Sequence, residues 1–300
     1  MIVHNKLTKI IPFLPHIIKG EYNLFSFVLI GGSSYKSVFF DKFDPGKNDN
    51  FYKEFKHESE YPNINFQTRL SKISITFSFD RPTDLLNNNL YGGEKYKNIY
   101  VASLKDLTIK NYAKFIYDTL TYYKIKPPYV FIVFSEGGYD VLCFSKYYSN
   151  LIKNIYFVDT PFLEQYLLKF EKFRGGKDDP NQGLGFMKRL SEKKFSWDGK
   201  YKSMKKNTLI KIDLYNFEIK TYNIILKLNI NDFPKEIPIV IFWSPYFDSP
   251  TKKSTEKIKI IKTMNTKLSN NIKTLFVDAP HQMERVIPIT LSKYIIKNIQ

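Results

Sequence analysis

Hydrophobic residues along the chain gather in short runs that alternate with segments of helical spacing. The runs are rich in β-branched and aromatic residues, which is typical of buried strands. They predict strands near residues 24–31, 73–79, 129–134, 154–159, 237–243 and 272–278. Segments with helical spacing of apolar residues predict helices near residues 104–124, 138–150, 252–269 and 287–298. This alternation predicts an α/β fold with a mostly parallel central sheet of about six strands flanked by helices.

The alternation is interrupted once. Residues 162–235 lack a regular succession of strand and helix patterns and include the loop-like stretch RGGKDDPNQGLG at 174–185. Residues 1–161 and 236–300 are therefore predicted to form one core, with 162–235 as an insertion. A chain of 300 residues is long enough to bury a substantial core.

The segment 129–138, YVFIVFSEGG, carries the strongest chemical signal. An apolar strand pattern stops at Ser135, and a glycine pair follows before the next helix pattern. This is the arrangement of a nucleophile elbow, in which a tight turn exposes a serine hydroxyl at the end of a strand. Gly137, two residues after the serine, is expected where the returning helix leaves no room for a Cβ.

Two further residues follow in an informative order. Asp248 comes just after the predicted strand 237–243, and His281 comes just after the predicted strand 272–278. Parallel sheets bind ligands at the carboxyl ends of their strands, which is where all three residues are expected. The chain order Ser, Asp, His is that of one triad-bearing fold and not of the others.

With these segments the chain resembles the α/β-hydrolase fold superfamily from about residue 22 to its C-terminus. The resemblance rests on the ordered set FVLIGGSS at 27–34, ITFSFDRP at 75–82, VFSEGG at 133–138, FDSP at 247–250 and APHQMERVIPITLSKYI at 279–295.

The resemblance implies a catalytic triad. Ser135 would be the nucleophile, His281 the general base and then acid, and Asp248 the residue that orients the histidine. Asp159, at the end of the predicted strand 154–159, is the alternative acid, because some relatives carry theirs at that place.

The resemblance also implies an oxyanion hole and a cap. The backbone amides of Gly32 and Glu136 would form the hole, and the insertion 162–235 would form a cap or lid. Two positions depart from the usual pattern. Val133 stands where a small residue is common, two before the nucleophile, and Ile30 replaces the histidine of the usual His-Gly pair.

Composition changes this picture little. The formal net charge is +17, yet only five of the 46 basic residues are Arg and the lysines are dispersed, which argues against nucleic-acid binding. The single cysteine, Cys143, suits a reducing compartment and is expected to be a buried packing thiol. There is no apolar run long enough for a membrane span and no signal-peptide pattern, so a cytoplasmic location is expected.

Together these features predict a serine hydrolase, a carboxylic ester hydrolase that cleaves an ester, thioester or related acyl bond of a small-molecule substrate. No cofactor is expected, and no motif indicates a metal site. The alternative is a catalytically retired protein of this fold that acts as a binding or interaction module. Val133, Ile30 and the carboxylate of Glu136 motivate that alternative, and oligomeric state is not predicted.

Overall fold

A computed structural model shows how the predicted core is built. The structure describes residues 14, 16–32, 40, 65–81, 108–135, 137–160, 233–246, 253–266 and 268–299. The predicted insertion 162–235 lies outside the described residues except for positions 233–235.

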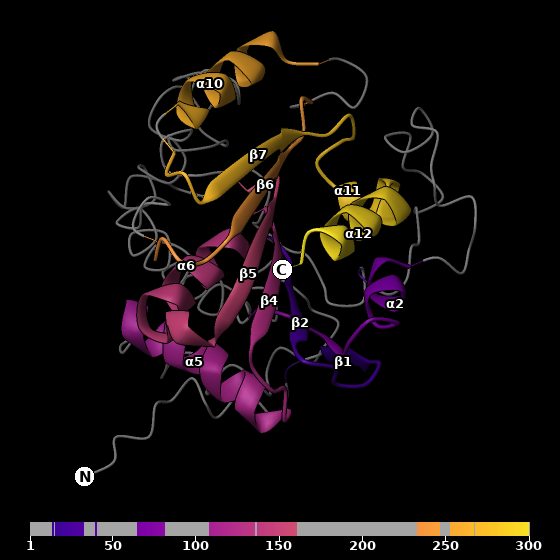
Figure 1. Cartoon of the computed structure of the whole chain (residues 1–300), viewed down its shortest axis with the longest axis vertical. Coiled ribbons are helices and arrows are strands. Elements are labelled where there is room, and N and C mark those ends of the chain that lie inside the picture. Colours follow the sequence, from indigo (N-terminus) through magenta and orange to yellow (C-terminus); the bar gives the residue numbers. More distant parts are fainter. Residues whose placement is uncertain are drawn as a thin grey trace, which may run out of the picture.

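One central sheet organises the described residues (Figure 1). Its strands are β1 (His16–Lys19), β2 (Ser26–Ile30), β3 (Thr76–Phe79), β4 (Tyr129–Phe134), β5 (Ile152–Val158), β6 (Ile239–Trp243) and β7 (Ile272–Phe276). They lie in the order β1-β3-β2-β4-β5-β6-β7. Strand β1 is antiparallel to β3, and every other neighbouring pair is parallel.

The predicted mostly parallel sheet is therefore confirmed, with one strand more than the six apolar runs. Every residue of β2, β4 and β6 is buried, which explains why these strands appear in the sequence as continuous apolar runs. Parallel strands covered by helices on both faces are apolar throughout and do not alternate. The added strand, β1, is a four-residue edge strand with exposed and half-buried positions, so it lacks such a run.

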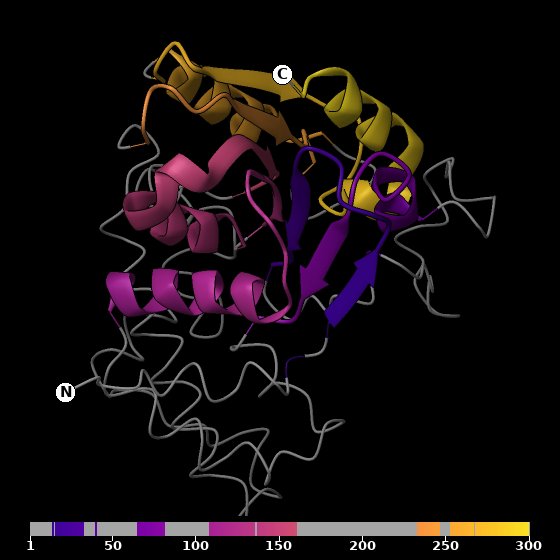
Figure 2. The same cartoon turned by 60° about the horizontal axis from the view of Figure 1, so that its bottom comes forward.

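Helices cover both faces of the sheet (Figures 1 and 2). The helices are α2 (Phe66–Leu70), α5 (Ile109–Tyr122), α6 (Gly137–Tyr148), α10 (Thr255–Asn265), α11 (Met283–Val286) and α12 (Pro288–Lys297). Helices α5, α6 and α10 share one hydrophobic core with alternate residues of the strands. Helices α2, α11 and α12 share a second core on the opposite face. The sheet thus lies between two apolar layers. The ends of its strands are not part of these layers and can hold polar functional residues.

Cys143 lies in α6 and is buried, as predicted. Burial raises the pKa of its thiol well above the ordinary range, so it stays protonated at neutral pH and has no nucleophilic thiolate. Among the described residues there is no helix with the length and apolar character needed to cross a membrane.

Candidate functional site

Ser135 directly follows β4, the central strand of the sheet. Its φ is +47°, in the left-handed region that a non-glycine residue rarely occupies. Its backbone N–H donates to the carbonyl oxygen of Val158 on β5 at 3.1 Å, and its own carbonyl accepts from the N–H of Gly138 at 3.1 Å. The chain thus turns sharply from β4 into α6, and Ser135 is the turning residue, partly exposed.

The two glycines after this turn are required by close packing. A Cβ at Gly137 would lie 2.6 Å from the carbonyl oxygen of Ile30 and would also collide with that of Gly31. A Cβ at Gly138 would collide with the side chain of Thr160, beyond the end of β5. The close approach predicted for Gly137 is therefore present, and it brings the exit of β2 against the start of α6.

The two departures from the usual pattern face each other in the sheet. Val133 on β4 pairs with Ile30 on β2, and both side chains are fully buried in the core shared with α5 and α6. Ser135 keeps its left-handed turn two residues beyond Val133. The β-branched side chain is thus absorbed by the core and does not prevent the sharp turn.

Asp159 holds the equivalent position on the neighbouring strand. Phe134 is in register with Val158, so Ser135 and Asp159 follow the ends of adjacent parallel strands side by side. Asp159 also has a left-handed φ, +45°. Its N–H donates to the carbonyl of Phe242 at 2.8 Å. One carboxylate oxygen, Oδ1, accepts the N–H of Ser244 at 3.0 Å.

The other carboxylate oxygen of Asp159 meets the candidate histidine. His281 Nδ1 lies 2.7 Å from Oδ2 of Asp159, a short hydrogen bond between residues 122 positions apart. His281 sits in the loop between β7 and α11, and its side chain remains 37% exposed, whereas that of Asp159 is 4% exposed. A buried carboxylate therefore holds a partly exposed imidazole by one nitrogen, leaving the second nitrogen, Nε2, for other chemistry.

Lys257 of α10 is a third member of this cluster. Its ammonium lies 3.0 Å from Oδ1 and 3.1 Å from Oδ2 of Asp159, and 3.0 Å from the carbonyl oxygen of Tyr246. Burial alone would raise the pKa of the Asp159 carboxyl, but the charge of Lys257 and the hydrogen bond to His281 outweigh it. The pKa of Asp159 is therefore below its usual value, and the group is a carboxylate at neutral pH.

Comparison with known proteins bears on the fold. No family model matches the sequence, and no curated protein matches it. Solved structures do. A hydrolase from Oleispira antarctica aligns with a TM-score of 0.51 at 13% identity, covering 95% of this chain and 94% of that one. A carboxylesterase from Bacillus subtilis aligns at 0.51 and 14%, covering 94% and 86%. A protein that recognises and ring-cleaves the Pseudomonas quinolone signal aligns at 0.52 and 11%, covering 95% of each chain.

The chain has the α/β-hydrolase fold. The predicted resemblance is thus confirmed at the level of the fold by alignments that span nearly the whole chain. Because this fold supports several chemistries, the function has to be argued from the residues at the strand ends.

The described part of the α/β-hydrolase fold contains four of the predicted site residues. Ser135, Asp159 and His281 gather at one edge of the sheet as described above, and Gly32 is buried just beyond β2. Asp248 and Glu136 lie outside the described residues. Nδ1 of His281 is bonded to Asp159, the alternative acid of the sequence analysis.

Lys257 was not among the predicted site residues. It lies within the predicted helix 252–269, and its contact with Asp159 joins residues 98 positions apart, which no local pattern signals. A metal centre has no support in the part of the chain described here, where no group of three or more His, Cys, Asp or Glu side chains is placed to hold an ion.

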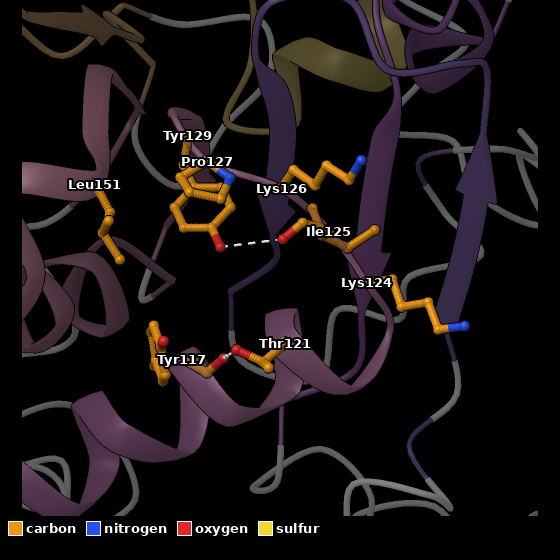
Figure 3. Close-up of a pocket in the computed structure, with 8 residues that line it drawn as sticks. All are labelled: Tyr117, Thr121, Lys124, Ile125, Lys126, Pro127, Tyr129 and Leu151. Carbon is orange, nitrogen blue, oxygen red and sulfur yellow. Dashed lines mark hydrogen bonds between the residues drawn. The ribbon is translucent and has the colours of Figure 1, made fainter.

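A separate pocket of about 380 Å³ opens at the other end of β4 (Figure 3). It is lined by residues of α5, by the connection into β4 and by Leu151, and it is mostly apolar. The hydroxyl of Tyr129, the first residue of β4, donates to the carbonyl of Ile125 across one side of it. Ser135 follows the last residue of the same strand, so this pocket is not part of the candidate site.

Proposed function

We propose that the protein is a serine hydrolase that cleaves an ester, thioester or related acyl bond. The observation that carries the proposal is the 2.7 Å hydrogen bond between Asp159 and His281 beside Ser135, which occupies the left-handed turn at the next strand end. A serine hydroxyl is a weak nucleophile at neutral pH and needs an oriented base nearby. This arrangement offers a base, a residue that orients it and a sharply turned serine.

Each residue has a role that its surroundings suit. Ser135 attacks the acyl carbonyl carbon while Nε2 of His281 accepts the hydroxyl proton, which later passes to the leaving group. Asp159 keeps Nδ1 protonated and stabilises the imidazolium ion that forms. Water then releases the acyl group from Ser135 by the same steps.

The developing negative charge on the carbonyl oxygen needs backbone donors. We assign these to the amides of Gly32 and Glu136. The support for Gly32 is the contact between the exit of β2 and the start of α6, where a Cβ at Gly137 would lie 2.6 Å from the carbonyl of Ile30. That contact brings the loop after β2 to the nucleophile turn.

A carboxylic ester is the substrate class we favour. The Bacillus subtilis structure that shares the fold is a carboxylesterase, and the Oleispira antarctica structure is a hydrolase. The ring-cleaving protein has the same fold, so the substrate class is argued from the site residues and not from the fold alone.

Labelling with a fluorophosphonate probe tests the proposal. This probe reacts with an activated serine hydroxyl, so we expect the wild type to label and Ser135→Ala and His281→Ala to lose at least 100-fold in labelling rate. Two variants serve as matched controls. Ser145→Ala removes a buried serine of α6, and His16→Ala removes a histidine of β1 at the far edge of the sheet. Both should label as the wild type does.

A folded wild type that does not label would refute the proposed activity. Labelling that survives Ser135→Ala would refute the assignment of the nucleophile. After positive labelling, p-nitrophenyl esters of increasing acyl length measure kcat/KM and define the size of the acyl pocket.

A further inference from the structure

The carboxylate of Asp159 accepts hydrogen bonds from two side chains that can carry a positive charge. Lys257 binds both of its oxygens, at 3.0 and 3.1 Å, and His281 binds Oδ2 at 2.7 Å. Lys257 is itself largely buried, with 12% of its side chain exposed, and is also held by the carbonyl of Tyr246. An ion pair so shielded from solvent is screened far less than a surface pair.

This sharing has a consequence for the histidine. A carboxylate beside an imidazole favours the protonated ring, because the negative charge stabilises the imidazolium ion. A fixed cation on the same carboxylate opposes that stabilisation, so removing the cation should strengthen the hold of the carboxylate on the imidazolium ion. The lysine also bonds to both oxygens of the carboxylate, which limits the rotation of that group.

We propose that Lys257 is a positioning residue that holds Asp159 and shares its negative charge, and so sets the pH above which His281 can act as a base. The inference rests on the proposed function, because His281 is a base only if the site is a hydrolase. Lys257 acts through Asp159 and is not assigned any contact with the substrate.

Two titratable groups beside this cluster, Tyr246 and Asp278, keep one charge state near neutral pH, and on the side of α11 the buried Glu284 and its neighbour Arg285 follow His281 in the chain. The Tyr246 hydroxyl donates to Asp278 at 2.7 Å, and burial together with that bond raises the pKa of Tyr246 to about 12. The bonds from Tyr246 and Lys253 lower the pKa of Asp278, which therefore stays ionised. Ser244 contributes a backbone N–H, which does not titrate. Of the described side chains in contact with the Asp159 carboxylate, His281 and Lys257 are the two that can carry a positive charge.

The experiment compares two neutral variants, Lys257→Gln and Lys257→Met, with Lys257→Arg, which keeps the charge. The matched control is Lys253→Gln, which removes a cation beside the start of the same helix from an exposed pair with Asp278, 52% and 65% exposed. Two readouts are followed: the acid limb of the pH profile of kcat/KM, and the titration of the His281 ring by NMR. His281→Ala assigns the ring signal.

We expect the neutral variants to move both the acid limb and the ring titration to higher pH by about one unit, from the loss of one shielded charge. At a pH on the limb, kcat/KM should fall about tenfold, whereas on the alkaline plateau it should change by less than about threefold. Lys257→Arg and Lys253→Gln should leave both readouts within about 0.3 unit of the wild type. A purely structural lysine would lower activity at every pH without moving the limb.

Several outcomes would overturn the inference. An unchanged titration of the His281 ring in Lys257→Gln and Lys257→Met would overturn it, whether or not the protein hydrolyses an ester. So would a uniform loss of activity, or failure of both neutral variants to fold at low temperature, since the lysine would then be structural. If the ring titration moves as expected but no ester is cleaved, the coupling of Lys257 to His281 stands and the proposed function fails.

Discussion

Asp159 combines an unusual backbone conformation with three hydrogen-bond partners for its carboxylate, two side chains and one backbone N–H. Its φ of +45° is one that aspartate and asparagine tolerate better than most other residues. The turn directs the carboxylate toward the N–H of Ser244, the ammonium of Lys257 and the ring of His281. Because asparagine accepts the same backbone, Asp159→Asn tests the charge with little disturbance of the turn.

We expect Asp159→Asn to lower kcat by roughly 10³–10⁴, because the amide cannot hold the ring in the correct tautomer or stabilise the imidazolium ion. Asp248→Asn is the matched variant, since Asp248 is the other acid that the sequence suggests, and its kcat should stay within about threefold of the wild type. Steady-state kinetics with a p-nitrophenyl ester at pH 8 measure both. The reverse ranking would return the role to Asp248.

Strand β3 and helix α6 are joined by a buried ion pair. Arg81, two residues beyond β3, donates from Nε to Oδ2 of Asp140 at 2.7 Å and from Nη2 to Oδ1 at 3.1 Å. The side chains are 3% and 1% exposed, and Asp140 lies in the first turn of α6, just after the nucleophile turn. The bidentate geometry ties the start of α6 to the residues just beyond β3.

Removing the arginine alone should therefore be costly. We expect Arg81→Met to lower the free energy of unfolding by about 3–5 kcal/mol at pH 7, because it leaves the Asp140 carboxylate buried without this counterion. Burial raises the pKa of Asp140, although the arginine acts to lower it, so without Arg81 the acid takes up a proton more readily. The loss should thus be smaller at pH 4. Urea unfolding followed by circular dichroism at both pH values measures the difference.

Two comparisons make this test specific. Lys114→Met breaks the surface pair with Asp118, whose partners are 50% and 18% exposed, and should cost no more than about 0.5 kcal/mol. Arg81→Met combined with Asp140→Leu removes both buried charges and should recover most of the stability. A double variant as unstable as Arg81→Met would contradict the electrostatic explanation.

The elements that could be predicted from sequence carry an apolar run or a helical spacing of apolar residues, even where burial is partial, as in β7. Strands β2, β4 and β6 are buried along their whole length and read as apolar runs. The four-residue edge strand β1 and the five-residue helix α2 are too short to establish a period and were missed. A sequence pattern thus indicates an element only where enough residues establish a run or a period.

The candidate site also contains residues that the local sequence indicates and residues that only the tertiary structure brings together. Ser135 was predictable because its local constraints, a strand end followed by Gly137, are written in adjacent residues. The choice between Asp159 and Asp248 was not, because both follow predicted strands and the contact with His281 depends on tertiary structure. Lys257 is a further case, since a lysine within a helix pattern carries no sign of the carboxylate that it meets.

The chain has 46 basic and 29 acidic residues, so every carboxyl that takes up a proton adds to an existing excess of positive charge. Acid should therefore destabilise the fold in two ways: by general repulsion, which salt screens, and by the loss of particular carboxylates. Asp159 is the carboxylate for which the second effect is clearest. Its pKa is lowered in the folded protein by Lys257 and His281 against the opposing effect of burial.

The sign follows from the direction of this shift. Because the folded carboxyl has the lower pKa, the unfolded chain takes up the proton first as the pH falls, and protons favour unfolding. The contribution of Asp159 is complete above the ordinary aspartate pKa of about 3.9 and is lost as the pH falls through the lower pKa of the folded state. We therefore expect the free energy of unfolding to decline steeply below about pH 4, where the pH falls below the ordinary aspartate pKa.

Urea unfolding between pH 6 and pH 2.5, at low and at high salt, separates the two effects. High salt should reduce the general repulsion. The double variant Asp159→Asn with Lys257→Met removes the buried pair and should show a shallower decline below pH 4 than the wild type at either salt concentration. Asp278→Asn, which removes a carboxylate 65% exposed, should change the decline far less. If the double variant declines as steeply as the wild type, acid sensitivity arises from the overall charge and not from the Asp159–Lys257 pair.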